Sequence, residues 1–270
     1  MTQPLPELLE KLTRGNAEER RSACRDAVEN PSAIVLVDAL AEALGDSEKA
    51  VARAASDALV KIDSQGGGVR KAIRKALQSD VPSRRQGAAF TAARIEPPGP
   101  RLLPALVEAL GSADGDVRWA AARLIVEIGR AHGEVLLLLL AMVRTADQAV
   151  QRRMATFALR ELAPDRAEAA EALLGAARDT DLQVRRAALT AMASLTAPPP
   201  GVVTRLLEAL REDEDAASRR LAALALGEIG RADPRAISPE AIRQLRDCEA
   251  RSPDSELRRA VQRALARVEA

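Results

Sequence analysis

Apolar and small residues recur along the chain at helical spacing. In the segment "DLQVRRAALTAMASL", from Asp181 to Leu195, the residues three, seven and ten positions after Arg185 are Ala188, Met192 and Leu195. These offsets fall on one face of a helix with 3.6 residues per turn, whereas the alternation typical of a strand appears nowhere in the chain. The segment therefore predicts a helix with one buried face.

The same pattern occurs eight times. The positions equivalent to Arg185, here called anchors, follow one another at intervals of 31 to 39 residues, and seven of the eight are arginine: Arg21, Ala52, Arg85, Arg118, Arg152, Arg185, Arg219 and Arg258. A further apolar segment leads into the next anchor, as at residues 101–110 and 201–210. Each unit is thus a first helix, a turn, a second helix that carries the anchor, and a break. Such a unit buries its apolar face only against its neighbours, which predicts a stack of repeats.

Helix-breaking residues are predicted to end the second helices. Glycine and proline both disfavour a helix interior, and they occur at Pro31, Gly66–Gly68, Pro97–Pro100, Gly129, Pro164, Pro198–Pro200 and Gly230. Pro31 closes a degenerate first repeat early, and residues 231–240 form an insertion before the last repeat. We predict an all-α protein with about sixteen helices, in one continuous domain over residues 1–270.

One repeat carries a family resemblance. The segment "LLPALVEALGSADGDVRWAAARLIVEIG", Leu102 to Gly129, resembles a HEAT repeat of the short bacterial kind named after phycobilisome lyases. The motif is Asp, then Val-Arg, then Ala-Ala, then Leu, and the resemblance covers nearly the whole chain. It implies a right-handed α-solenoid of about eight HEAT-like two-helix repeats, with the second helices on the concave face. It also implies that Asp and Arg side chains form a ladder between stacked repeats.

An aspartate stands four residues before several anchors, at Asp114, Asp181, Asp215 and Asp254. An Asp just before a helix accepts hydrogen bonds from the first backbone N–H groups and complements the helix dipole. We therefore interpret these residues as helix caps, and the family resemblance implies that the anchor arginines are structural. Ligand binding by the anchor arginines is the alternative.

Composition narrows the class of function. Lys and Arg total 40 and Asp and Glu total 39, so the formal net charge is only +1 and does not favour nucleic acid or anionic lipid. Cys24 and Cys248 lack the paired spacing of a disulfide framework or zinc site, and Cys24 is interpreted as a small buried residue. The most apolar run, Val135 to Val143, is shorter than the roughly 20 residues that span a bilayer. With no signal-peptide pattern at the start of the sequence, we expect a cytoplasmic protein without membrane contact.

No catalytic arrangement is apparent in the sequence. The one histidine, His132, lies in a predicted loop, and no paired His-Glu or Cys-x-x-Cys motif suggests a metal site. The glycines at 66–68 lack the preceding strand and following Gly-Lys-Ser/Thr of a phosphate-binding loop. We therefore expect no catalytic residues, no metal and no cofactor, and do not expect an enzyme.

The outward positions of the second helices provide the candidate binding surface. The residues one after the anchors are Ser22, Arg53, Gln86, Trp119, Arg153, Arg186, Arg220 and Arg259, and those five after are Asp26, Asp57, Phe90, Arg123, Phe157, Thr190, Leu224 and Arg263. The charges indicate that these two columns face solvent, and they contain every aromatic residue of the protein. Clustered aromatic and arginine side chains are typical of binding hot spots. The alternative is that the rings fill the inner wall of a tightly curved solenoid.

The leading hypothesis is a non-enzymatic protein–protein interaction scaffold. Its partner would be another protein, presenting a peptide, helix or domain of acidic and apolar character to the concave face. The predicted partner-binding residues are Phe90, Trp119, Arg123, Arg153, Phe157, Arg186 and Arg220. The alternatives are a nucleic-acid-binding HEAT-like protein, which would use the arginine column, and an accessory subunit of a lyase-type enzyme.

Overall fold

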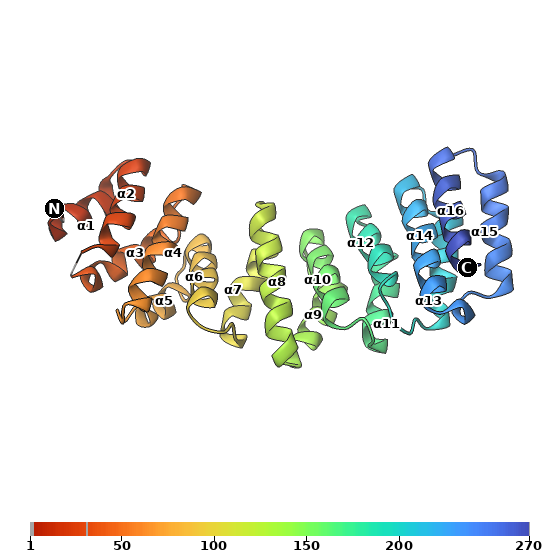
Figure 1. Ribbon diagram of the computed structural model, residues 1–270, viewed down its shortest axis with the longest axis horizontal. Helices are drawn as coiled ribbons and strands as arrows, with labels where there is room; N and C mark the ends of the chain where they lie inside the picture. The colour runs from red at the N-terminus through yellow and green to blue at the C-terminus, as the bar shows by residue number, and fades with distance from the viewer. Residues whose placement is uncertain (1–2, 31, 270) are drawn as a thin grey trace. The chain divides into compact units, whose positions relative to one another are not determined.

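The computed structural model describes residues 3–30 and 32–269 (Figure 1). Over these residues the chain forms sixteen α-helices and three short 3₁₀ turns, and no strand. The prediction of an all-α protein with about sixteen helices is confirmed. Pro31, which was expected to close the first repeat, lies outside the described residues.

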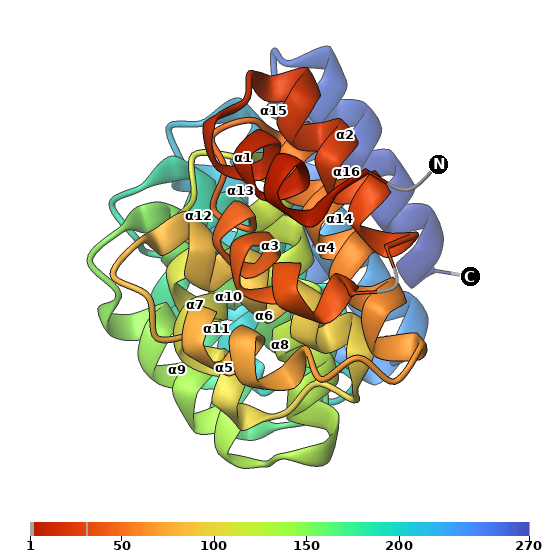
Figure 2. The same ribbon diagram turned by 90° about the vertical axis from the view of Figure 1, so that its left-hand side faces the viewer.

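The helices group into two compact units, and the boundary lies between Val117 and Arg118. The first unit contains α1 (Leu5–Arg14), α2 (Ala17–Val28), η1 (Ala33–Leu36), α3 (Val37–Ala43), α4 (Lys49–Ser64), α5 (Arg70–Ala76), α6 (Pro82–Ile95), η2 (Pro100–Leu102) and α7 (Leu103–Ala109). The second helices α2, α4 and α6 pack in one layer, and the first helices α1, α3 and α5 pack in a layer beside it (Figure 2).

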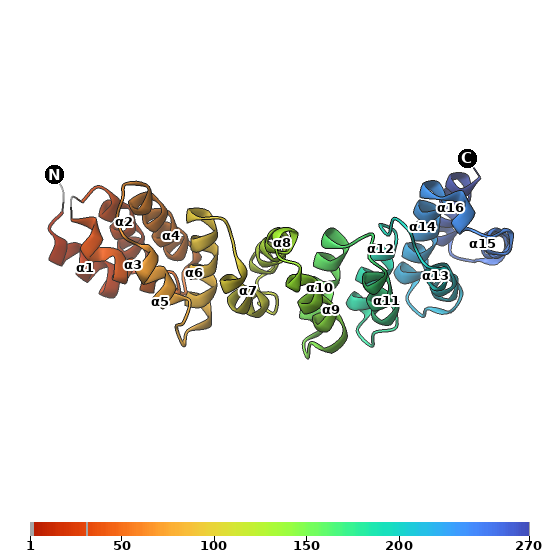
Figure 3. The same cartoon turned by 90° about the horizontal axis from the view of Figure 1, so that it is seen from below.

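The second unit repeats this two-layer arrangement. Helix α8 (Gly115–Ala131) contains the boundary and is followed by α9 (Glu134–Thr145), α10 (Ala149–Leu162), α11 (Ala167–Ala176), α12 (Leu182–Met192), α13 (Pro200–Glu212), α14 (Ala216–Ala232), η3 (Pro234–Ala236), α15 (Pro239–Arg251) and α16 (Ser255–Val268). The second helices α10, α12, α14 and α16 pack against one another in order, and the first helices α9, α11, α13 and α15 form the other layer (Figure 3). That the chain forms one continuous domain stays a prediction.

Small residues lie where second helices meet. Ala121, Ala155 and Ala188, each three residues after an anchor, have no exposed surface, as the repeat register predicts. At Gly227 a Cβ atom would lie 2.7 Å from the Cα atom of Ala264, so α14 and α16 are in backbone contact at this point. Residues without bulky side chains let the helix axes approach closely.

Two of the predicted helix breaks are wrong. Gly129 and Gly230 lie inside α8 and α14, which continue to Ala131 and Ala232. A glycine costs a helix only about 1 kcal/mol and does not by itself end it. Glycine lets neighbouring side chains approach at both positions, because a Cβ atom on Gly129 would lie 2.6 Å from Cδ2 of Leu162, and one on Gly230 would lie closer still to Cγ2 of Val268. The proline breaks behave as predicted, since α6 ends before Pro97 and α10 before Pro164.

Candidate functional site

Ion pairs connect neighbouring second helices at their N-terminal ends. Arg152 of α10 donates two hydrogen bonds to Asp179, at 2.7 and 2.9 Å, and Arg185 of α12 lies 3.4 Å from Asp213. Both aspartates lie six residues before the next anchor, in the turn between a first and a second helix. The expected ladder therefore exists, but Arg152 and Arg185 pair with these turn aspartates and not with the aspartates four residues before the anchor. The anchor Arg85 pairs instead with Glu108 of α7.

The aspartates four residues before the anchors cap helices, as predicted. Asp181 accepts hydrogen bonds from the backbone N–H groups of Gln183 and Val184, and Asp215 and Asp254 begin α14 and α16 in the same way. Asp114 accepts a hydrogen bond from the backbone of Asp116 and forms an ion pair with Lys49 of α4. An Asp cap stabilises a helix by roughly 1 kcal/mol.

A second row of ion pairs involves two of the predicted partner-binding arginines. Arg186 donates two hydrogen bonds to the capping Asp215, at 2.7 and 2.9 Å, and Arg220 lies 2.9 Å from Glu256 and 3.7 Å from Asp254. The hydrogen bonds from Arg186 hold the pKa of Asp215 far below its ordinary value. The sequence pattern predicts the outward position of both arginines but not these ion pairs. A capping aspartate in the following repeat is the signal that could have suggested them.

The aromatic residues are only partly covered. Trp119 of α8 is 46% exposed, and Phe157 of α10 is half-buried. Their ring centroids are 4.5 Å apart with the planes at 87°, an edge-to-face pair, which is a favoured geometry for aromatic rings. Arg160 lies over the Phe157 ring at 5.0 Å. Sequence analysis did not select Arg160, although its position three residues after Phe157 places it on the same side of the helix.

The other predicted contacts differ in their surroundings. Phe90 is half-buried in α6 and belongs to the first unit, whereas Trp119 and Phe157 of the second unit form a ring pair. Arg123 is exposed and Arg153 half-buried, and neither forms an ion pair with another described residue. Their side chains therefore differ from those of Arg186 and Arg220 in having no carboxylate to hold them in place.

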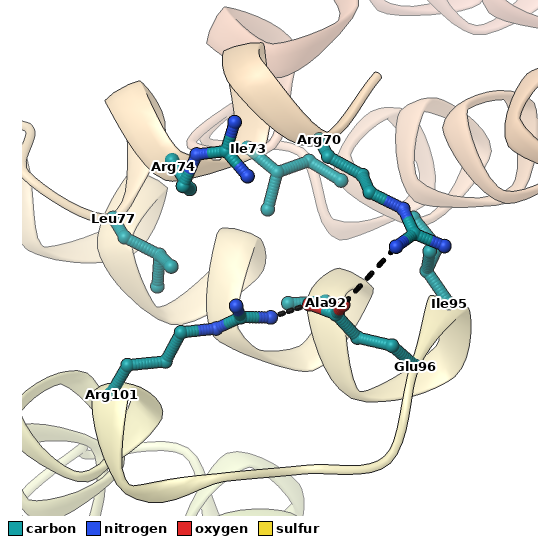
Figure 4. Close-up of a pocket in the computed structure, with 8 residues that line it drawn as sticks. All are labelled: Arg70, Ile73, Arg74, Leu77, Ala92, Ile95, Glu96 and Arg101. Atoms are coloured by element: carbon teal, nitrogen blue, oxygen red, sulfur yellow. Dashed lines mark ion pairs between the residues drawn. The ribbon is translucent and has the colours of Figure 1, made fainter. Parts of the chain in front are cut away.

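A small cavity in the first unit is a structural contact between helices. Glu96, directly after α6, forms ion pairs with Arg70 of α5, at 3.6 Å, and with Arg101 of η2 (Figure 4). Ile73 and Leu77 also line the cavity, whose volume is only about 10 Å³, roughly the space for one water molecule. The arrangement links α5, α6 and η2 and leaves no room for a ligand.

The remaining candidate chemistry is sparse. His132 is partly exposed, and its Nδ1 lies 3.7 Å from a carboxylate oxygen of Glu134. Cys24 is fully buried, as its small-residue column predicts, and burial raises the pKa of its thiol to about 12. Among residues 3–30 and 32–269 there is no group of three or more His, Cys, Asp or Glu side chains placed to hold a metal ion. Nor does that part of the chain contain a helix with the length and apolar character needed to cross a bilayer.

Comparisons with known proteins agree with the repeat pattern. The HEAT-repeat family profile matches residues 71–160 and 171–266, which is more than half of the chain. Curated protein sequences contain no match. Among solved structures, importin beta matches 98% of this chain and 40% of its own length, with 17% identity and a TM-score of 0.60. YibA of E. coli matches 98% of this chain and 93% of its own, with 18% identity and a TM-score of 0.56. The similarity at this level is one of fold, a solenoid of helical repeats.

Proposed function

Because the chain belongs to the HEAT-repeat family, we propose that it is a non-enzymatic scaffold that binds a segment of another protein on the outward side of its second helices. The observation that carries the proposal is the exposure of Trp119, the single tryptophan, which is 46% exposed while its ring packs edge-on against Phe157. A large ring held in place by a neighbour but open to solvent is typical of an interaction hot spot.

The surroundings of the ring pair support a partner with acidic and apolar character. Arg123 follows Trp119 by four residues on α8, and Arg153 precedes Phe157 by four residues on α10, so each arginine shares a helix face with a ring. Neither arginine has a carboxylate partner among the described residues. A partner segment that covers Trp119 with an apolar side chain can therefore place carboxylates on these arginines.

The other predicted contacts belong to the proposal in different roles. Arg186 and Arg220 are held by Asp215 and Glu256, so they offer ordered guanidinium groups and not free cations. Phe90 occupies in α6 the position that Phe157 occupies in α10, five residues after the anchor. Its part in binding stays a prediction.

A selection from a displayed peptide library, with the intact protein immobilised, tests the proposal. We expect enriched peptides that combine acidic and apolar residues and that shift the fluorescence emission of Trp119 on binding. Trp119→Ala should weaken their binding by about 30-fold or more, equivalent to about 2 kcal/mol. The matched control is Leu137→Ala, which removes another exposed apolar side chain, 70% exposed, from the first helix α9.

Equal binding to the wild-type protein and Trp119→Ala, or loss of binding in Leu137→Ala alone, would contradict the proposed surface. A gel shift with single- and double-stranded oligonucleotides tests the nucleic-acid alternative, because phosphate contacts weaken steeply as salt increases. Salt-sensitive oligonucleotide binding that Trp119→Ala abolishes would replace the proposed partner with a nucleic acid.

A further inference from the structure

A groove of about 460 Å³ crosses the outward side of α12, α14 and α16, within the second unit. Leu221 and Leu224, both half-buried, contribute apolar surface to it. Four arginines from three successive repeats line it: Arg186, Arg220, Arg259 and Arg263. The groove therefore combines apolar surface with a concentration of positive charge that the net charge of the whole chain does not reveal.

The four arginines are not equivalent. Arg186 and Arg220 are bound to Asp215 and to Glu256, so their charges are compensated within the fold. Arg259 and Arg263 are exposed, and neither forms an ion pair or a side-chain hydrogen bond with any residue that the structure describes. They lie four residues apart on one face of α16, where two like charges repel each other.

We propose that this groove binds a short acidic peptide segment, whose carboxylates pair with Arg259 and Arg263. The inference rests on the proposed function, because the groove lies on the same outward side of the second helices as Trp119. It adds the chemistry of the segment that would bind there. Carboxylates bind guanidinium groups through two parallel hydrogen bonds, and they would remove the repulsion between the two arginines.

The spacing favours acidic residues at alternate positions of an extended peptide. Side chains four residues apart on a helix have Cβ atoms about 5–6 Å apart, and alternate residues of an extended chain are about 6.6 Å apart on one side. An apolar residue two positions beyond such a pair lies on the same side of the extended peptide and can contact Leu221 and Leu224. A long polyanion fits less well, because a phosphate backbone has no apolar side chain to contact Leu221 and Leu224.

Fluorescence anisotropy with a labelled peptide tests the inference. The probe is a fluorescein-labelled nine-residue peptide with Glu-Ser-Glu-Ser-Leu at its centre and Gly/Ser flanks, and in the comparison peptide both Glu residues are replaced by Gln. We expect the Glu peptide to bind the wild-type protein at least tenfold more tightly than the Gln peptide, and at least tenfold more tightly than it binds Arg259→Gln/Arg263→Gln. The charge-matched control is Arg235→Gln/Arg251→Gln, which removes two exposed arginines outside the groove and should bind like the wild type.

Three results would overturn the inference: no saturable binding of the Glu peptide to the wild type, equal loss of binding in both double variants, or tighter binding of a labelled oligothymidine of the same length. A parallel titration of Trp119→Ala separates this inference from the proposed function. If the Glu peptide binds Trp119→Ala as tightly as it binds the wild type, the groove acts without Trp119. A displayed-library selection that yields no peptide would in that case count only against the proposed Trp119 surface.

Discussion

Arg152 in α10 holds both carboxylate oxygens of Asp179, in the turn before α12, through its Nε at 2.7 Å and its Nη2 at 2.9 Å. The pair is largely shielded from water, with side chains 16% and 11% exposed. Asp179 also accepts a hydrogen bond from the backbone N–H of Asp181, the residue that caps α12. A single carboxylate thus joins one repeat to the start of the next second helix.

Asp179→Ala should destabilise the protein by about 1–3 kcal/mol, because it leaves the shielded guanidinium of Arg152 without its charged partner. The measurement is urea unfolding followed by circular dichroism at 222 nm. Glu168→Ala is the matched control, since it breaks an Arg–carboxylate pair whose side chains are both 53% exposed, and exposed pairs contribute little to stability. Equal unfolding midpoints for the two variants would show that the Arg152–Asp179 pair contributes no more than a surface pair.

Stability should fall at acid pH. Hydrogen bonds from Arg152 and Arg186 hold the pKa values of Asp179 and Asp215 below the ordinary value of 3.8. Because both pKa values are lower in the folded state, the unfolded chain takes up protons first as the pH decreases, and the stabilisation present above pH 3.8 is lost as the pH falls through the folded values. We expect a constant thermal midpoint between pH 7 and 5 and a decline below about pH 4, with a smaller decline in Asp179→Asn. A midpoint independent of pH down to 2.5 would contradict this account.

The repeat units could be predicted from the sequence because the pattern of small, apolar and capping residues that forms each unit is local and recurs along the chain. Ala155 is buried and Asp181 caps α12, as the register predicts. The pairing of side chains between units could not be predicted in the same way. Arg153 and Arg186 stand in the same column, and a capping aspartate follows each of them in the next repeat. Only Arg186 pairs with that aspartate, Asp215, although Asp181 and Asp215 both accept hydrogen bonds from the backbone of their own helices. This difference depends on side-chain conformations across the contact, which the spacing of residues does not encode.

Two helical glycines should respond to alanine in opposite directions. Gly227→Ala in α14 would place a Cβ atom 2.7 Å from the Cα atom of Ala264, so α16 would have to move, and the variant should be less stable than the wild type. Gly175→Ala in α11 meets no atom within 4 Å, and should be more stable by up to about 1 kcal/mol, because alanine is the better helix former. Thermal unfolding measures both. A Gly227→Ala variant as stable as the wild type would contradict the close backbone contact between α14 and α16.

Arginine reversals should separate binding from folding on the outward face. From the sequence alone, Arg186→Glu would be expected mainly to slow the association of an acidic partner, because a charge at the edge of an interface acts on the encounter rate. The structure changes that expectation, since a glutamate at position 186 would face Asp215, the cap of α14, and replace two hydrogen bonds with repulsion. Arg153→Glu makes the same charge change at the equivalent position of α10, where no ion pair to another described residue is lost.

We therefore expect a lower thermal midpoint for Arg186→Glu and an unchanged one for Arg153→Glu. Because Arg153→Glu keeps the fold intact, it is the variant to use in association-rate measurements with an acidic peptide, where it should bind more slowly than the wild type. If Arg186→Glu unfolds at the wild-type temperature, the Arg186–Asp215 pair does not contribute to the contact between repeats, and Arg186 is free to serve a partner.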